Sequence, residues 1–334
     1  MKTNKKILLI NFGGIGDEIL FLPTVDTVRK ANPSATIFLA VEPRSKSIME
    51  LTQAVDDIIE IDIKSKHKYV NIFKLLCFAW LEKFDIVISS GANKSIPILL
   101  KLMGAKQSYG YNSGFLAAKL LTNPVDLNTK QYAGKMYHDL VASMGTNTDF
   151  IPKITLEEIQ KIPNSILIHP GVSKMSVQKN IIKIFGAEIW TEIIERLLQN
   201  GKTVLLAGGP DDDEVIKKIV ESLKNKNLLK SQNFINLYGK TRSIKDLARR
   251  IKEAEILLCS DSAPMHIGVG VGTKTFAIFG PTDENKLLPQ NENFVPLSVN
   301  CECRPCLWDK RQTSCENQKC LQFIPEQIVA KIIQ

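Results

Sequence analysis

Residues 256–266 read Ile-Leu-Leu-Cys-Ser-Asp-Ser-Ala-Pro-Met-His and join an apolar run to a turn and the start of a helix. The run Ile256–Cys259 is short and apolar, as in a buried strand of a parallel sheet. Pro264 suits the first turn of a helix, where the N–H groups have no intrahelical partner. Those N–H groups and the positive end of the helix dipole attract anions. The stretch therefore predicts a phosphate-binding corner to which His266 adds a donor.

The alternation of strand and helix extends along most of the chain. In the first half we expect strands at Lys6–Phe12, Thr36–Val41, Asp57–Ile61, Asp85–Ser89 and Gln107–Tyr109, with helices at Asp17–Ala31 and Tyr69–Lys83. In the second half we expect strands at Ser165–His169, Lys202–Ala207, Phe234–Leu237, Glu255–Cys259 and Lys274–Phe279, with helices at Ala187–Gln199, Asp212–Leu223, Ser243–Ala254 and Pro264–Gly270. Short strands separated by helices predict βαβ units and parallel sheets.

The segment Phe150–Asn164 contains two prolines and breaks this alternation, which predicts a linker. The chain is thus expected to form two Rossmann-like α/β domains facing across a cleft, over residues 1–155 and 165–334. Ligands of such sheets bind beyond the carboxyl ends of the strands, so the cleft is the expected active site. One placement for a final helix at Pro325–Ile333 is across the first domain.

Length and composition agree with two globular domains. The chain has 334 residues, of which 44% are hydrophobic and 23% charged. The apolar run after the basic start ends at Phe12 and meets glycines rather than a cleavage site, so we expect a cytoplasmic protein, with a peripheral position on the inner face of the membrane as the alternative. The net charge of +8 permits anionic partners, although most lysines are expected to be solvated. The absence of any nucleic-acid-binding motif argues against nucleic acid.

Five cysteines crowd into residues 301–320. The spacing Cys303-x-x-Cys306 is that of zinc ligands, and Cys315 and Cys320 would complete a structural site. A loop of reduced thiols and a disulfide pair are the alternatives, the second disfavoured in a cytosolic setting. The sequence leaves these open.

The first strand leads into Gly13-Gly14-Ile15-Gly16-Asp17-Glu18. The glycines allow a sharp turn and the close approach of another molecule. Asp17 would begin a helix at the carboxyl end of the strand, although an acidic residue there also serves simply to oppose the helix dipole. Pro23 predicts either a kink in this helix or a helix that properly begins near it.

Three further loops follow strands of the second half. His169-Pro170-Gly171-Val172-Ser173 could contact a phosphate through Ser173, with Lys183 among the lysines that follow. Gly208 and Gly209 would let a ligand approach the backbone, and the carboxylates from Asp211 to Glu214 could accept hydrogen bonds from ribose hydroxyls or oppose a helix dipole. The stretch Gly280–Asp283 follows the strand after the phosphate corner and is expected to line the same pocket.

Taken together, these motifs resemble glycosyltransferase family 9, the bacterial heptosyltransferase-like enzymes of lipopolysaccharide core assembly. The resemblance spans nearly the whole chain. It rests on 12–18 (FGGIGDE) with Leu22-Pro23, on His169-Pro170-Gly171, on 183–190 (KIFGAEIW), on Gly208-Gly209-Pro210, on 261–266 (DSAPMH) and on 279–283 (FGPTD).

The resemblance implies a GT-B fold and an inverting, metal-independent transfer of a sugar from a nucleoside-diphosphate donor, ADP-heptose being the favoured one, to a lipopolysaccharide-core or related glycan acceptor. No cofactor beyond the nucleotide sugar is implied. Asp17 maps to the general base of the family and Lys183 to the cation that neutralises the diphosphate. The sequence Phe185-Gly186 stands where the family has Trp-Pro. The diphosphate would bind Asp261, Ser262, Ala263 and His266, and the ribose a carboxylate, Asp213 or Glu214.

These roles agree with the chemistry, because an inverting transfer needs a base for the acceptor hydroxyl and positive charge for the leaving diphosphate. The acceptor is expected on the first domain, near Gly14, Gly16, Arg44, Lys46 and Lys94, of which Lys94 aligns with a basic residue common in the family. A nucleotide-sugar epimerase or hydrolase, and a non-catalytic nucleotide-sugar-binding protein, are the alternatives on the same fold.

Overall fold

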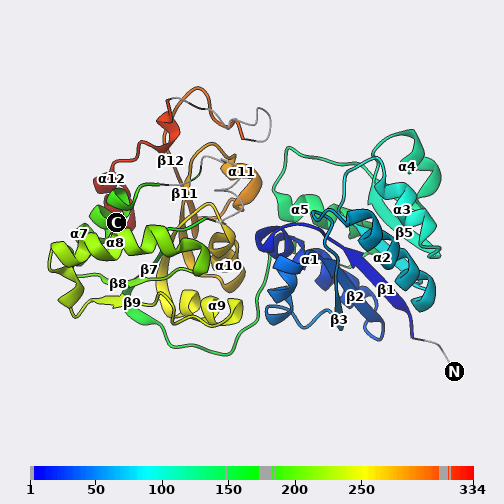
Figure 1. Cartoon of the computed structure of the whole chain (residues 1–334), viewed down its shortest axis with the longest axis horizontal. Helices are drawn as coiled ribbons and strands as arrows, with labels where there is room; N and C mark the ends of the chain where they lie inside the picture. The colour runs from blue at the N-terminus through cyan, green and yellow to red at the C-terminus, as the bar shows by residue number, and fades with distance from the viewer. Residues whose placement is uncertain (1–3, 147–148, 173–182, 184, 308–314, 316) are drawn as a thin grey trace. The chain divides into compact units, whose positions relative to one another are not determined.

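The computed structural model describes residues 4–146, 149–172, 183, 185–307, 315 and 317–334. It divides into two compact domains, Met1–Ile154 and Thr155–Gln334. Each domain is built on a six-stranded sheet with helices on both faces (Figure 1). Covering both faces is the rule for parallel sheets, whose strands are apolar throughout.

The N-terminal domain alternates strands and helices as predicted. Its strands are β1 (Lys6–Ile10), β2 (Thr36–Val41), β3 (Asp57–Glu60), β4 (Ile86–Ser89), β5 (Gln107–Tyr111) and β6 (Asn123–Val125). Its helices are α1 (Ile15–Ala31), α2 (Lys68–Glu82), α3 (Ile96–Leu102), α4 (Phe115–Leu120) and α5 (Ala133–His138), with 3-10 helices η1 (Pro43–Glu50) and η2 (Asp139–Met144).

All strand pairs in this sheet are parallel, in the order β3-β2-β1-β4-β5-β6. The helices α2, α3 and α4 pack on one face through Leu75, Leu100 and Ala117, and α5 lies beside α1 (Figure 1). The helix α1 begins at Ile15 and continues through Pro23, so the prediction of a start near Pro23 was wrong. Pro23 is one of the buried residues of the helix.

The C-terminal domain repeats the design. Its strands are β7 (Ile162–His169), β8 (Thr203–Leu206), β9 (Phe234–Asn236), β10 (Ala254–Ser260), β11 (Lys274–Phe279) and β12 (Phe294–Ser298). Its helices are α7 (Ala187–Gln199), α8 (Asp213–Asn225), α9 (Ile244–Glu253), α10 (Ala263–Val271), α11 (Glu284–Leu287) and α12 (Pro325–Ile333), with 3-10 helices η3 (Pro210–Asp212), η4 (Leu228–Lys230) and η5 (Lys319–Leu321).

The order β12-β11-β10-β7-β8-β9 is the N-terminal order written from the other edge. Both sheets therefore have the Rossmann order 3-2-1-4-5-6, in which the strand order reverses between the first and fourth strands. These switch points lie between β1 and β4 and between β7 and β10. The sequence predicted neither β6 nor β12, which lie at sheet edges.

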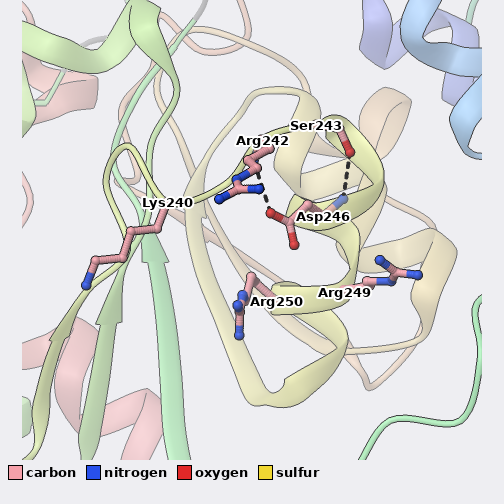
Figure 2. Close-up of a pocket in the computed structure, with 6 residues that line it drawn as sticks. All are labelled: Lys240, Arg242, Ser243, Asp246, Arg249 and Arg250. Atoms are coloured by element: carbon pink, nitrogen blue, oxygen red, sulfur yellow. Dashed lines mark hydrogen bonds between the residues drawn. The ribbon is translucent and has the colours of Figure 1, made fainter.

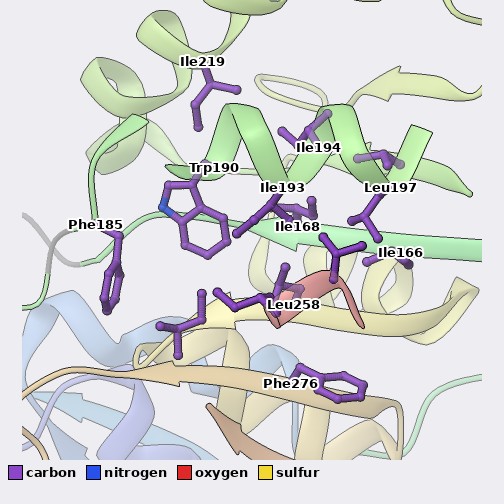
Figure 3. Packing of buried hydrophobic residues seen from close by; sticks show 14 of the residues in the cluster. Ile166, Ile168, Phe185, Trp190, Ile193, Ile194, Leu197, Ile219, Leu258 and Phe276 are labelled. Carbon is purple, nitrogen blue, oxygen red and sulfur yellow. The ribbon is translucent and has the colours of Figure 1, made fainter. Parts of the chain in front are cut away.

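The core of the C-terminal domain forms around α7. Trp190, Ile193 and Leu197 of this helix point at the strands below them (Figure 3). The helix α12 packs on α7 and buries Ile328, Val329 and Ile332 in the same core. The alternative placement of this helix across the first domain was therefore wrong, because its apolar face is used within its own domain. None of the described helices is long and apolar enough to cross a membrane.

Candidate active site

A lysine ion pair lies at the carboxyl edge of the C-terminal sheet. The Nζ atom of Lys183 is 2.7 Å from Oδ2 of Asp261, the residue that follows β10. The hydroxyl of Thr282, which follows β11, donates to the same carboxylate oxygen. The side chains of Lys183 and Asp261 are 15% and 5% exposed, so the pair is shielded from water. Its two members are therefore strongly dependent on one another.

This pairing changes the role that Asp261 can play. A carboxylate repels a diphosphate, and Oδ2 of Asp261 is already occupied by Lys183 and Thr282. An ammonium group has three donors, so the bond to Asp261 leaves Lys183 with two more. The geometry gives Asp261 a place from which it positions Lys183, and its contact with the diphosphate stays a prediction.

The predicted phosphate corner is formed by the start of α10. Ser262 is the N-cap residue, Ala263 begins the helix and Pro264 lies in the first turn, as expected. The Ser262 hydroxyl donates to the carbonyl of Gly171 at 3.1 Å, and Ser260 donates to that of Pro170 at 2.9 Å. These bonds join the ends of β10 and β7 across the switch point. His266 is buried within the same helix.

A buried carboxylate fixes the neighbouring loop. Asp212 accepts a bond of 2.7 Å from the Gly209 N–H and lies 3.6 Å from Nε2 of His169. Burial raises the pKa of Asp212 and lowers the pKa of His169. Gly171 packs against this carboxyl so closely that a Cβ there would lie 1.6 Å from Oδ1 of Asp212. Only glycine fits at that position unless Asp212 moves.

The two candidates for the ribose carboxylate differ in surroundings. Asp213 accepts bonds of 2.6 Å from the Tyr238 hydroxyl and 2.7 Å from Lys217. Glu214 is 84% exposed and pairs only with Lys218, one helical turn further on. Gly208 packs against Ile216, and Gly209 caps η3. Of the two carboxylates, Asp213 is the better placed to meet a ribose. Its partner Tyr238 follows β9 and so lies at the carboxyl edge of the sheet, where ligands bind. Ser173 lies outside the described residues.

In the N-terminal domain, Asp17 sits where α1 begins. Its carboxylate accepts a bond of 2.8 Å from the Gly14 N–H, which is the N-cap position. A hydrogen bond with Asp17 also contributes to a raised pKa at Tyr137, whose main cause is burial. Gly13 lies against the same side chain, since a Cβ there would be 2.3 Å from the Cβ of Asp17. Asp17 thus lies in the first turn of α1, where a negative charge opposes the helix dipole. Its side chain is half-buried.

The predicted acceptor residues do not all gather here. Arg44 on η1 lies over Gly14, where a Cβ would be 3.5 Å from its Nη1 atom, and it pairs with the buried Glu42. Gly16 lies in the first turn of α1. Lys46 instead pairs with Glu60, and Lys94 is exposed in the loop that follows β4. The structure thus brings Arg44 to the Gly14 backbone at the start of α1, whereas Lys46 pairs with Glu60.

Glu18 is a neighbour that the sequence analysis missed. Its side chain is buried beside Asp17, and burial, followed by the charge of Asp17, raises its pKa well above the ordinary value. Asn11 lies close enough to oppose that shift, but neither carboxyl oxygen completes a well-directed bond within the described part of the chain. Asn11 itself accepts from the Ser90 hydroxyl at 2.6 Å, which joins the ends of β1 and β4. The sequence did offer a sign of this buried acid, because Glu18 stands among the apolar residues that α1 turns toward the core.

Arg304 was also missed. Its guanidinium donates to the carbonyls of Gly280 and Thr282, at 2.6 and 3.2 Å, and to Glu284 at 2.8 Å. It therefore holds the loop that carries Thr282, and through Thr282 it supports the bond to Asp261. An arginine inside a cysteine-rich segment gave no sequence signal for this role.

The cysteine-rich segment contains thiols close to one another. Burial and the neighbouring thiols of Cys301, Cys303, Cys306 and Cys315 raise the pKa of Cys320 to about 11. None of the described cysteines forms a disulfide. Among the described residues, no group of three or more metal-ligating side chains is arranged to hold an ion, and the structural zinc site stays a prediction.

A separate pocket lies beside α9. It has a volume of about 470 Å³ and is lined by Lys240, Arg242, Ser243, Asp246, Arg249 and Arg250 (Figure 2). The charges of two arginines are already paired, Arg249 with Glu157 and Arg250 with Glu253. The pocket contains none of the predicted site residues.

Comparison with known proteins identifies the family. Residues 82–318 match the family described as glycosyltransferase family 9 (heptosyltransferase). The chain belongs to glycosyltransferase family 9. Lipopolysaccharide heptosyltransferase 3 of Escherichia coli K12 is 24% identical over 94% of this chain and 93% of its own. Lipooligosaccharide heptosyltransferase 2 of Campylobacter jejuni is 29% identical, but over about half of each chain (49% of both).

Solved structures agree on the fold of this glycosyltransferase. A glycosyltransferase family 9 protein of Veillonella parvula has a TM-score of 0.76 at 23% identity, covering 99% of this chain and 97% of its own. The ADP-heptose heptosyltransferase II of E. coli has a TM-score of 0.74 at 15% identity, covering 98% and 97%. The predicted GT-B fold, with two Rossmann-like domains, is confirmed.

Proposed function

We propose that this glycosyltransferase moves a heptose from an ADP-activated donor to a hydroxyl of a lipopolysaccharide-core or related glycan, with inversion and without a catalytic metal. Family membership and relatives named as lipopolysaccharide heptosyltransferases support the reaction class. A structure of E. coli heptosyltransferase WaaC with ADP-2-deoxy-2-fluoro heptose, 17% identical, shares the fold and supports the donor class.

The observation that carries the proposal is the shielded Lys183 ammonium. It is paired with Asp261, which also accepts from Thr282, at the carboxyl edge where α10 begins. As the bond from the anomeric carbon to the diphosphate breaks, its electron pair stays on the diphosphate oxygen. Lys183 and the N–H groups of α10 stabilise that charge. A preorganised lysine supplies the positive charge that a metal would otherwise bring.

The base in this proposal is Asp17. Its carboxylate takes the proton of the acceptor hydroxyl while the hydroxyl oxygen forms the new bond to the anomeric carbon, on the side opposite the leaving group. The Gly14 N–H and Tyr137 hold the carboxylate in one orientation. Arg44, over Gly14, would contact an acidic or phosphorylated acceptor sugar.

The decisive experiment replaces Asp17 by Asn, which keeps the shape and removes the base. We expect the transfer rate from ADP-heptose to fall by roughly 10²- to 10⁴-fold, while the Kd for ADP stays unchanged. Asp26→Asn, on the same helix, is the matched control. A normal transfer rate in Asp17→Asn would remove Asp17 from the role of base.

Two further readouts separate the alternatives. Activity that survives EDTA supports transfer without a metal, and dependence on an added divalent ion contradicts it. The fold is also shared, at a TM-score of 0.53 and 12% identity, with the UDP-GlcNAc 2-epimerase of Methanocaldococcus jannaschii. Conversion or hydrolysis of a nucleotide sugar without any acceptor would therefore favour the epimerase or hydrolase alternative over transfer.

A further inference from the structure

The N-terminal domain carries an unusual concentration of exposed apolar side chains. Among the described residues, eleven large apolar side chains are exposed, and nine of them lie on α2, α3 and α4. On α2 these are Tyr69, Val70, Phe73, Trp80 and Leu81; on α3, Ile98 and Leu102; and on α4, Phe115 and Leu116. We call these nine residues the apolar face. Surface apolar residues scattered singly need no explanation, but a concentration on neighbouring helices does.

These helices form one layer whose other side is already packed. Leu75 and Ala79 of α2 are buried against the sheet, so the exposed residues form a second apolar stripe on the helix. The indole of Trp80 donates to the Leu102 carbonyl at 2.7 Å, which ties α2 to α3, and α3 packs against α4. The apolar face is therefore a continuous layer that its own domain leaves uncovered.

The stretch 64–119, which contains these helices with the loops and strands between them, carries most of the net charge of the protein, and four of its lysines lie on the helices themselves. Residues 64–119 contain nine lysines and two acidic residues, a net charge of +7, against +8 for the whole chain. Two of the lysines are paired, Lys64 with Glu42 and Lys106 with Asp85. The other seven are exposed and have no carboxylate within ion-pair distance in the described chain. These lysines are solvated, as the sequence analysis expects, and they lie in the same segment of the chain as the apolar face.

Lysine and aromatic groups are interleaved at close range. The ammonium of Lys119 lies 4.1 Å from the ring centre of Phe115, and that of Lys68 lies 4.9 Å from the ring centre of Tyr69. Long lysine stems can cover apolar surface while the ammonium reaches outward to a polar layer. Aromatic residues with basic neighbours are typical of surfaces that bind in the headgroup region of a bilayer.

We propose that the apolar face and its seven unpaired lysines dock the enzyme on an anionic phospholipid bilayer. Each lysine near an anionic surface adds to the attraction, and the exposed aromatic and aliphatic side chains enter the headgroup boundary. A protein partner is less suited, because lysine is depleted at the centres of protein interfaces. A second copy of the chain would bring two lysine-rich segments together, which repel.

The position of the apolar face gives this docking a consequence. In a parallel sheet, each helix that follows a strand begins at the carboxyl edge. Tyr69, Ile98 and Phe115 lie in the first turns of their helices, and Asp17 lies in the first turn of α1, at the same edge of the same sheet. Docking would therefore hold the acceptor side of the N-terminal domain near the lipid surface. The docking itself does not rest on the proposed transfer.

The test is sedimentation with lipid vesicles in the absence of nucleotide sugar. The protein is mixed with vesicles of phosphatidylethanolamine and phosphatidylglycerol, and separately with vesicles of phosphatidylcholine. We expect binding to the anionic vesicles that weakens as salt is raised. The variant Lys66→Glu/Lys74→Glu should bind about 30-fold or more weakly. Tyr69→Ser/Phe73→Ser/Phe115→Ser should bind about tenfold or more weakly, also at low salt.

The matched controls lie on the C-terminal domain. Lys224→Glu/Lys230→Glu reverses two exposed lysines, and Ile324→Ser/Ile333→Ser removes the two exposed apolar residues outside the apolar face. Both should bind vesicles as the unmodified protein does. Equal binding to both kinds of vesicle, no binding, or an equal loss in the controls would overturn the proposal. Loss of a dimer in the apolar-face variants, seen by analytical ultracentrifugation, would show that a second copy covers this face instead.

Discussion

The two domains share a strand order and differ in the charge they place at its switch point. In the N-terminal domain, Ser90 and Asn11 bridge the ends of the two central strands, and the side chains beside them are the carboxyls of Asp17 and Glu18. In the C-terminal domain, Ser260 and Ser262 make the bridge, and the neighbouring charge is the Lys183 ammonium. One backbone design thus holds two carboxyl groups in one domain and a lysine–aspartate pair in the other. Function in this fold lies in the loops rather than in the sheet.

The surfaces of the domains differ as well. Nine of the described exposed large apolar residues lie on the N-terminal helices, and only Ile324 and Ile333 lie on the C-terminal domain. In the C-terminal domain, α12 covers α7 and buries its own apolar face. The N-terminal domain has no equivalent covering helix among the elements described. The same architecture therefore leaves one domain closed and the other open to a further contact.

The largest effect that tests the charge difference is expected at Lys183. Replacement by Met keeps the length of the side chain and removes the charge that stabilises the leaving diphosphate. We expect kcat/KM to fall by about 10²- to 10³-fold and the Kd for ADP to rise. The measurements are steady-state kinetics and calorimetric titration with ADP.

A double variant checks that Asp261 acts through Lys183. If Asp261 only positions the ammonium, Asp261→Asn should add little to the loss already caused by Lys183→Met. Lys224→Met, at an exposed lysine of the same domain, is the control and should leave both readouts unchanged. Independent and multiplying losses would show that Asp261 contacts the substrate itself.

The fold could be predicted from the sequence because its signals are local and repeated. Strands such as Lys6–Ile10 and Lys274–Phe279 are buried on both sides and read as apolar runs, and each is followed by glycine or a helix start. The edge strands β6 and β12 were missed because each is short or interrupted by a proline, Pro124 or Pro296. Their position depends on the finished sheet rather than on their own residues.

The sequence could propose the residues of the candidate site but not their contacts. Asp17, Lys183 and the 261–266 stretch were recognised from their motifs, whereas the pairing of Lys183 with Asp261 joins residues far apart in the chain. Arg304 contacts backbone carbonyls, which every loop has, so no pattern of residue types could predict its contacts. The burial of Glu18 follows from the packing of α1, which only the folded structure fixes.

An intermediate effect is expected at Arg304. This residue holds the loop that carries Thr282, which in turn donates to Asp261, the partner of Lys183. Arg304→Gln removes the charge and the forked contacts to the 280–284 loop. With this loop loosened, Thr282 holds Asp261 less firmly, and we expect ADP to bind about tenfold more weakly. The control is Arg196→Gln, at a partly exposed arginine that pairs with Glu192 of its own helix. An unchanged Kd for ADP together with unchanged thermal stability would show that the loop does not need Arg304.

The smallest effect concerns Glu18 and appears as a dependence of stability on pH. Burial raises the pKa of Glu18 in the folded protein, whereas the unfolded chain keeps an ordinary value. As the pH rises past that ordinary value, the unfolded chain loses the proton first, so the free energy of unfolding falls, by at most about 1.4 kcal/mol per pH unit, until the pH reaches the folded pKa. Glu18→Gln mimics the neutral acid and removes this loss.

The variant should therefore gain stability relative to the unmodified protein as the pH is raised from about 5 to about 8, because only the unmodified protein has an acid left to ionise. Urea denaturation across that range measures the difference, and Glu221→Gln, at an exposed site, should show none. A constant difference between Glu18→Gln and the unmodified protein would mean that Glu18 titrates alike in both states. Glu18 would then carry a charge at neutral pH, and the contrast between the two switch points would be stronger than the burial of Glu18 indicates.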